Sequence, residues 1–320
     1  MKNDPRRRFL GQMLAASAVG VAPPLFAAAP LAGGGALGVH RMKLGSFEVT
    51  TLLDGFIDLP GAVLQGDADA IQRALEAAKT KAPFRTAVNT FLVNTGSKLV
   101  LVDTGGAKML GPTAGRLPQA LAAAGVAPEQ VDEVYITHMH GDHLHGAVTP
   151  EGAKLFPNAV LRVAKLDVDY WGSAAVEAAA PDNQKGRFVP AKRAIAAYGD
   201  RLQTFELGAE LTPGIRSVAG VGHTPGHSCY LVSSGDAKLL LLGDTMHVAP
   251  VQFPRPEITV MFDFRQDLAR APRGAVRDGG EGGHVHRRRA PALPRHRQAA
   301  RARRRRLRLR PAALAAVLMP

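Results

Sequence analysis

The sequence predicts an α+β sandwich, with β-sheets inside and helices outside. Runs of apolar and β-branched residues, separated by Gly- and Asn-rich turns, are typical of strands. Segments with helical periodicity lie between them, but they do not alternate regularly with the strands, and no dinucleotide-binding glycine pattern is present. With 320 residues, the chain is long enough for a sizeable core in one large or two medium domains. No repeat of 20–50 residues is visible.

The elements can be placed in order along residues 45–263. Strands are expected within 47–59 and 89–106, where Asp-Gly and Asn-Thr-Gly-Ser form turns and the second run folds as a hairpin. A short amphipathic helix is expected within 113–126, with Leu117, Leu121 and Val126 near one face. Residues 131–143 predict a strand that runs into a loop, and 191–202 a helix. Further strands that end in loops with polar tips are expected within 215–234 and 237–247, and another strand is expected within 256–264.

The first 30 residues have the layout of an export signal. Arg6-Arg7-Arg8-Phe9-Leu10 fits the twin-arginine pattern, and an apolar run from Met13 to Ala22 and small residues at 27–29 follow. The apolar run is well short of the ~20 residues that cross a membrane. The prediction is export to the periplasm, with the cleavage site open. The alternative is a basic N-terminus without a targeting role.

The segment "ITHMHGDHLHGAV", residues 136–148, predicts a metal site. It holds His138, His140, Asp142, His143 and His145 within eight positions. Alternate residues at a strand end point the same way, so His138 and His140 can share one cation, whereas Asp142 and His143 can hold a second. Imidazole and carboxylate groups suit Zn²⁺, with Mn²⁺, Fe²⁺ or Co²⁺ possible. His145 is interpreted as a supporting or surface residue.

This arrangement resembles the metallo-β-lactamase superfamily over residues 45–263. The resemblance implies a metallo-β-lactamase-type αββα sandwich of four layers, with domain bounds near 40–263, and two Zn²⁺ ions. "LVDTGG" supplies Asp103, the acid that orients the metal loop. "GHTPGH" supplies the ligand His223 and its supporting residue His227, and "LLLLGDT" supplies Asp244, which bridges both ions.

Three further segments resemble the branch that contains methyl parathion hydrolase and related lactonases. They are "AVNTFLVNTGSKLVLVDTGG", "GPTAGRLPQAL" and "DVDYWGS". The branch lines its leaving-group pocket with aromatic residues, which implies that Trp171 and Phe188 line the pocket here. Leu110 stands where the branch has an aromatic residue, which argues against a preference for aryl phosphates. The alternative for Trp171 is an ordinary core tryptophan.

The implied chemistry is hydrolysis of a lactone, ester or phosphotriester by a hydroxide that two metal ions share, with Asp142 and Asp244 as catalytic residues. Thioester or β-lactam hydrolysis rests on the fold alone. The alternative is a metal-binding member with little or no hydrolase activity. The expected partner is a small-molecule substrate; no nucleic acid and no membrane span are expected, and a homodimer is left open.

The net charge of +13 belongs entirely to residues 264–320, which hold sixteen arginines, no lysine and three acidic residues. Residues 1–263 hold 24 basic and 24 acidic residues, so this part of the chain is neutral and the overall charge says nothing about what it binds. One interpretation of residues 264–320 is a basic tail that binds nucleic acid or anionic lipid. The other is a shifted reading frame, because out-of-frame translation of a GC-rich gene produces arginine-rich peptides.

The frame can be tested on the sequence itself. Residues 287–298, "RRRAPALPRHRQ", can encode "AAAHLPFPGIGK" when each codon is read from its second base. The branch carries a similar segment, and its histidine is the last metal ligand. That histidine would straddle Ala290 and Pro291, about 46 residues after Asp244. The resulting prediction is a frame-shifted, poorly packed tail over 264–320 that lacks the seventh ligand.

The single cysteine, Cys229, excludes an internal disulfide. No base is near it in the sequence, so it is expected to be a small buried apolar residue rather than a nucleophile.

Overall fold

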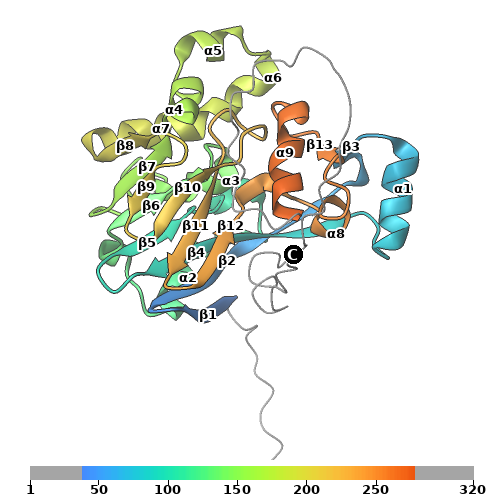
Figure 1. Cartoon of the computed structure of the whole chain (residues 1–320). Helices are drawn as coiled ribbons and strands as arrows, with labels where there is room; N and C mark the ends of the chain where they lie inside the picture. Colours follow the sequence, from blue (N-terminus) through green and yellow to red (C-terminus); the bar gives the residue numbers. More distant parts are fainter. Residues whose placement is uncertain (1–37, 278–320) are drawn as a thin grey trace, which may run out of the picture. The chain divides into compact units, whose positions relative to one another are not determined.

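The computed structural model describes residues 38–277, and this region contains two main β-sheets (Figure 1). The larger sheet has seven strands in the order β1-β2-β4-β5-β6-β7-β8, and the smaller has four in the order β12-β11-β10-β9. A third pair joins β13 to β3. The strands are β1 (Val39–Leu44), β2 (Phe47–Leu59), β3 (Leu64–Gln65), β4 (Phe84–Asn94), β5 (Leu99–Val102), β6 (Glu133–Tyr135), β7 (Val160–Ala164), β8 (Leu202–Phe205), β9 (Glu210–Thr212), β10 (Ile215–Ala219), β11 (Ser228–Ser234), β12 (Ala237–Leu241) and β13 (Thr259–Val260).

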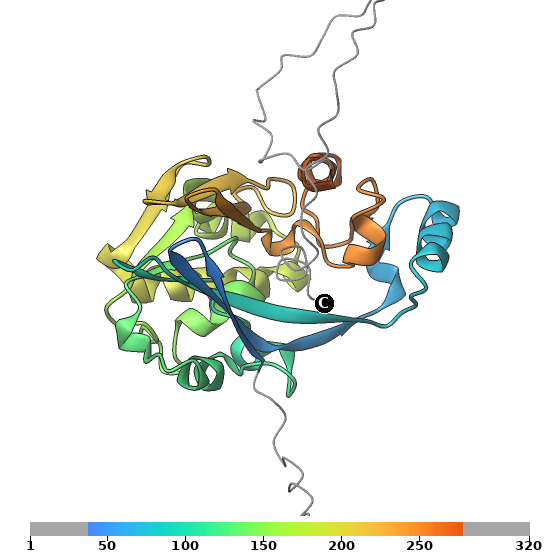
Figure 2. The same ribbon diagram turned by 60° about the horizontal axis from the view of Figure 1, so that its bottom comes forward.

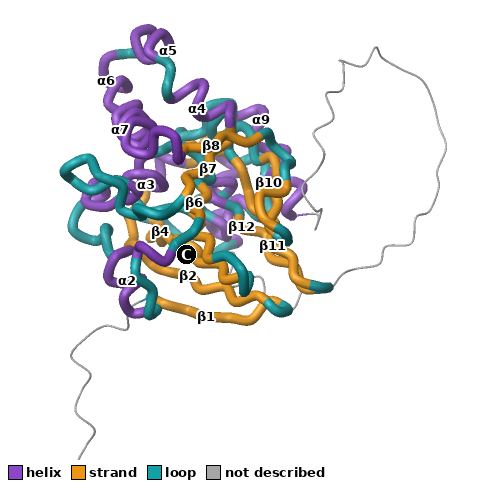
Figure 3. Tube along the Cα trace, turned by 90° about the vertical axis from the view of Figure 1, so that its left-hand side faces the viewer, coloured by secondary structure: helices purple, strands orange, loops and turns teal. Residues whose placement is uncertain are grey.

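Helices cover the outer face of the larger sheet. They are α1 (Ala68–Ala77), α2 (Leu117–Ala123), α3 (Gly141–Leu144), α4 (Lys165–Trp171), α5 (Ala174–Ala179), α6 (Asp182–Lys185), α7 (Val189–Tyr198), α8 (Ala249–Gln252) and α9 (Gln266–Arg277), of which α2, α3, α4 and α7 lie on that face. Figure 3 shows α2, α3 and α7 on one side of the larger sheet and β10 to β12 on the other. One apolar core lies between helices and sheet, and a second lies between the two sheets. The metallo-β-lactamase-type layered α+β fold is therefore confirmed.

The strand directions bring distant segments to one edge. Strands β5, β6, β7 and β8 run parallel, so their carboxyl ends lie together. Strands β10 and β12 are both antiparallel to β11, and their carboxyl ends also share an edge. The loops that follow β5, β6, β10 and β12 carry Asp103, the histidine segment, His223 and Asp244, respectively. The fold therefore gathers the expected metal-binding residues at the strand ends.

Most of the elements expected from the sequence are present. The strand within 47–59 is β2, and the hairpin within 89–106 is β4 and β5, joined where Asn94 pairs with Leu99. The helix within 113–126 begins only at Leu117, and Leu117 and Leu121 are buried as expected. Figure 2 shows β2 and β4 as a long twisted ribbon that reaches α1 and α8.

The turn expected at Asp54-Gly55 is wrong. Strand β2 continues through both residues, and its pairing with β4 shifts there as in a β-bulge. A side chain at Gly55 would meet the backbone of Thr113 and Ala114, within 2.2–2.4 Å, so only glycine fits. The bulge turns Asp54 inward, where it is fully buried and accepts hydrogen bonds from three backbone N–H groups, those of Gly106, Gly115 and Leu117.

Two expectations near the C-terminus also need correction. The strand within 256–264 shrinks to Thr259–Val260, because Asp263 turns back to accept a hydrogen bond from the Val260 N–H. The poorly packed tail does not begin at residue 264. The chain continues as α9 (Gln266–Arg277), which buries Ala269 and Arg273. The expected export signal and residues 278–320 of the expected shifted-frame tail, with His284, His286 and His296, lie outside the described residues.

Replacing Asp54 by Ala should destabilise the protein strongly. The change leaves three backbone N–H groups without an acceptor, two of them buried and that of Gly115 partly buried, and each buried loss costs about 1–3 kcal/mol. Urea denaturation followed by circular dichroism should show a lower midpoint. The matched control is Asp169→Ala, which removes an exposed ion pair with Lys165 and should change the midpoint little. Equal shifts in both variants would show that Asp54 does not organise this loop.

Candidate metal centre

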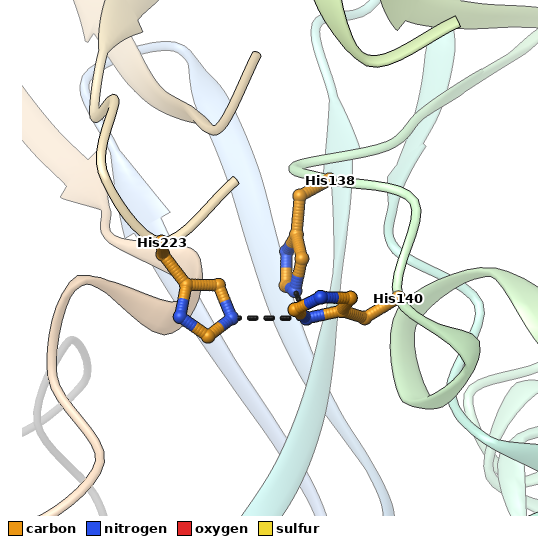
Figure 4. A group of neighbouring side chains, drawn as sticks. All are labelled: His138, His140 and His223. Atoms are coloured by element: carbon orange, nitrogen blue, oxygen red, sulfur yellow. Dashed lines mark hydrogen bonds between the residues drawn. The ribbon is translucent and has the colours of Figure 1, made fainter. Parts of the chain in front are cut away.

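Three histidines converge on one point. His138 and His140 follow β6, and His223 follows β10. His138 Nε2 lies 3.0 Å from His140 Nδ1, which lies 3.0 Å from His223 Nε2 (Figure 4). The three nitrogens form a group with the spacing that a shared metal ion requires. The sequence predicted that His138 and His140 lie together, and the resemblance added His223; the structure brings all three to one place.

In two of these rings, the nitrogen that points away from the shared point has a hydrogen-bonding partner. His138 Nδ1 lies 3.1 Å from the Thr137 hydroxyl, and His223 Nδ1 lies 3.1 Å from Asp263 Oδ1. A partner on one ring nitrogen fixes the tautomer and turns the lone pair of the other nitrogen toward a metal. Asp263 was not predicted as a site residue, because a single acid after a short strand has no distinctive spacing.

Asp244 lies between two groups of ligands. Its Oδ1 is 3.1 Å from His143 Nε2, whereas its Oδ2 is 3.3 Å from His223 Nε2 and 3.8 Å from His138 Nε2. The two oxygens therefore face different histidines, as in a carboxylate that bridges two cations. His227, the expected supporting residue, accepts a hydrogen bond from the backbone N–H of Asp244 through Nε2 at 3.0 Å.

The second group centres on His143. Its Nε2 lies 3.5 Å from Asp142 Oδ2 and 3.1 Å from Asp244 Oδ1. Its Nδ1 lies 2.8 Å from Asp103 Oδ2, and Asp103 also accepts hydrogen bonds from the backbone and hydroxyl of Thr137. Asp103 has a φ of +61°, a strained conformation for a residue with a side chain. The expected orienting acid is thus in contact with the metal loop.

A buried carboxylate that was not predicted joins two ligand loops. Asp167, in α4, accepts hydrogen bonds from the backbone N–H groups of Met139 and Gly226 and from the Thr224 hydroxyl. Met139 lies between His138 and His140, and Thr224 follows His223. Asp167 therefore fixes the spacing between segments that lie far apart in the sequence.

His247 also belongs to the site, although the sequence did not single it out. It lies three residues after Asp244, and its Nε2 is 3.0 Å from Asp244 Oδ2. His223, Asp244 and His247 form a further group with ligand spacing. His145, by contrast, belongs to no such group among residues 38–277, which agrees with its interpretation as a residue outside the ligand set.

Burial and mutual proximity set the protonation of the cluster. Burial, reinforced by the neighbouring histidines, holds the pKa of His138 well below its usual range and lowers the pKa of His140 to about 3. Burial would also lower the pKa of His143, but the carboxylates of Asp244, Asp142 and Asp103 outweigh it and raise that pKa. At neutral pH, His138 and His140 are therefore neutral and can offer lone pairs to a metal ion.

A cavity of about 700 Å³ opens beside the second group. Asp142, His143, Asp244 and His247 line one end of it, and apolar residues of β4 and α8 line much of the rest. None of the three expected pocket residues lines this cavity.

Those three residues lie elsewhere. Trp171 packs its edge against the ring of His140 at 5.3 Å and contacts Phe188 at 5.0 Å, and both are buried in the core under the helices. Leu110 lies beside Gly106. Trp171 therefore occupies the position of a core tryptophan that also supports a metal-binding histidine.

Cys229 is buried, and burial raises the pKa of its thiol to about 11. It is therefore a buried apolar residue, as expected, and not a nucleophile.

The residues that are present fit divalent metal ions. Imidazole nitrogens and carboxylate oxygens are the donors that such ions prefer, and here they are buried, fixed by hydrogen bonds to their other atoms and linked by a shared carboxylate.

Comparison with known proteins agrees with this fold. The chain is similar to the hydrolase AbOPH of the beta lactamase superfamily, with 30% identity over 75% of this chain and 85% of that one and a TM-score of 0.70. It is similar to AidC, described as a dizinc quorum-quenching lactonase in complex with a product, with 26% identity, the same coverage and a TM-score of 0.68. A probable metal-dependent hydrolase from Staphylococcus aureus, at 20% identity over 73% and 84% of the two chains, shares the fold with a TM-score of 0.61.

Among curated proteins, no significant match is found. The profile of the Metallo-beta-lactamase superfamily matches residues 83–312, which is more than half of the chain. The chain is therefore a metal-dependent hydrolase that belongs to the metallo-beta-lactamase superfamily.

Proposed function

We propose that this protein is a dinuclear hydrolase that opens lactone rings, with esters and phosphotriesters as further substrates. The observation that carries the proposal is the position of Asp244. Its two carboxylate oxygens face separate histidine groups, as a dinuclear centre requires.

Zinc is the metal that we propose for both positions. His138, His140, His223 and Asp244 would hold the first ion, and Asp142, His143 and Asp244 the second. When bound, the ions supply Lewis acidity and a water molecule whose pKa falls toward about 7. The likeness to AidC, described as a dizinc enzyme, supports this choice.

The chain's own residues bind and orient the substrate and move a proton. Asp142 lies at the end of the cavity with its side chain 25% exposed, so it can reach a bound molecule. We assign to its carboxylate the acceptance of the proton that the attacking water loses and the transfer of that proton to the leaving oxygen. The apolar residues of β4 and α8 would exclude water around the rest of the substrate.

A lactone is favoured over an aryl phosphotriester for two reasons. AidC is described with the product of lactone hydrolysis, and the chain is 26% identical to it. In addition, Leu110 stands where the methyl parathion hydrolase branch has an aromatic residue, and Trp171 and Phe188, expected to line the leaving-group pocket, are buried in the core; the aromatic residues that line the cavity are instead Phe84, Phe91 and Phe253.

A second candidate is a fold member with little or no hydrolase activity. Within residues 38–277, the second group contains one histidine, His143, beside two carboxylates. The seventh ligand implied by the resemblance would be encoded in a shifted frame near Ala290 and Pro291, outside the described residues, and is expected to be absent from this chain. Comparing this chain with one translated from a frame-restored gene distinguishes the two candidates, because restoration raises activity only if that ligand is missing.

We also propose that the protein is exported to the periplasm through its twin-arginine signal. No helix among residues 38–277 is long and apolar enough to cross a membrane. The double variant Arg6→Lys with Arg7→Lys should remain in the cytoplasm, whereas Arg8→Lys, outside the arginine pair, should be exported normally. Fractionation followed by immunoblotting measures this. Export of the double variant would refute the signal.

Zinc-loaded protein should hydrolyse an N-acyl homoserine lactone faster than an aryl dialkyl phosphate. Dialysis against a chelator should abolish both activities, because every proposed step requires the metal, and added Zn²⁺ should restore them. Hydrolysis can be followed by pH indicator for the lactone and by phenolate absorbance for the phosphate. Activity that survives metal removal would exclude the proposed mechanism.

Asp244→Ala should lose hydrolysis and most of its bound metal, because both metal positions lose a ligand. Loss of an outer partner alone typically reduces metal affinity about 10–100-fold, so loss of a direct ligand should reduce it at least that much. His145→Ala is the control and should retain metal and activity. Metal content by atomic emission, measured with activity, tests this; equal damage in both variants would mean that the ligand set is wrong.

A further inference from the structure

Arg273 is a fully buried arginine in helix α9. Its Nη2 donates hydrogen bonds to Asp263 Oδ1 and Oδ2 at 3.1 and 2.8 Å, and its Nε donates to the main-chain oxygen of Thr245 at 2.6 Å. Buried charges are uncommon in proteins and are paired when they occur. Arg273 therefore joins the segment that contains Asp263 to the turn that contains Asp244.

Asp263 in turn contacts His223, a proposed metal ligand. Its Oδ1 lies 3.1 Å from His223 Nδ1, while its Oδ2 accepts the Val260 N–H. Burial would raise the pKa of Asp263, but the hydrogen bond with His223 and the charge of Arg273 outweigh it and lower that pKa to about 2. Asp263 is thus a permanent carboxylate behind the ring of His223.

The segment that leads into α9, and α9 itself, lie directly against the loop that carries His223. The backbone N–H groups of Phe264 and Arg265 donate to the carbonyl oxygens of His223 and Gly222. A side chain on Gly222, which has a φ of +127°, would lie 2.3 Å from the backbone nitrogen of Ala269. The close approach of helix and loop leaves the ring of His223 little freedom to move.

We infer that Arg273 is a positioning residue of the metal centre, which orients His223 through Asp263 and fixes the Asp244 turn through the Thr245 carbonyl. The inference rests on the proposed metal site. It explains how His223 and Asp244, which come from distant loops, are held at a fixed distance from each other. Through these contacts, α9 acts on the first metal position without contacting the metal.

The competing explanation is that the Arg273–Asp263 pair only attaches α9 to the fold. Two observations argue against it. Buried ion pairs seldom stabilise a protein more than apolar residues of similar size. Moreover, Arg273 Nη1 has no hydrogen-bond partner within the described part of the chain, so the pair is not optimised for stability alone.

The test compares metal binding in full-length wild-type protein, Arg273→Met and Arg270→Ala. Arg270 is exposed on the same helix and serves as the matched control. Titration of the apoprotein with Co²⁺, followed by visible absorption, should show about 10–100-fold weaker binding at the first position in Arg273→Met and an altered spectrum. Arg270→Ala should match wild type, and Arg273→Lys, which keeps the charge, should fall between.

A double variant separates positioning from stability. Arg273→Met alone leaves the Asp263 carboxylate buried without its cation and should lower the unfolding midpoint. Asp263→Asn combined with Arg273→Met removes both charges and should recover much of that midpoint. Co²⁺ affinity and spectrum should remain altered in the double variant despite its recovered stability, because His223 then lacks the carboxylate behind its ring and the Thr245 carbonyl lacks its donor.

The outcomes are distinct. If wild-type protein binds no Co²⁺, the proposed function itself fails. If wild type binds Co²⁺ and Arg273→Met binds it with equal affinity and the same spectrum, the positioning role is overturned. Recovery of both stability and Co²⁺ binding in the double variant would likewise overturn it and leave Arg273 as a structural residue.

Discussion

The site depends on three imidazole rings whose nitrogens converge on one buried point. The ring nitrogens of His138, His140 and His223 approach to 3.0 Å, and burial disfavours a proton on the first two rings. Such an arrangement is costly unless a cation occupies it, and it persists only when other groups hold the rings in place. Much of the surrounding structure, from Asp103 to Asp263, serves this requirement.

Buried carboxylates provide the rigidity. Asp54, Asp167 and Asp263 each accept backbone or side-chain hydrogen bonds from segments that are distant in the sequence. A carboxylate is suited to this task because it accepts several N–H groups at once, and hydrogen bonds to a charged group are stronger than neutral ones. The parallel ends of β5, β6 and β7 place Asp103, the metal loop and Asp167 at a common edge, so the connections are short.

The sequence predicted those parts of the site that have a recognisable local pattern. The His-x-His-x-Asp-His spacing and the long apolar strands are of this kind. Asp54 was mistaken for part of a turn, because the local sequence does not show that Thr113 approaches Gly55. Asp167 and His247 have no distinctive spacing. The arginine-rich composition of residues 264–320 concealed α9, because averaging over the whole segment hid a short stretch in which Arg273 is buried.

The order of the groups along the chain has a consequence for biosynthesis. Asp263 and Arg273 come after every metal ligand proposed within the described residues, yet they hold the ring of His223 and the turn of Asp244. A nascent chain that has exposed only its first 250 residues contains these ligands but not the groups that orient two of them. If Arg273 positions the ligands as inferred, tight metal uptake is expected only after α9 has left the ribosome and docked, so that this helix acts as a checkpoint for metal loading.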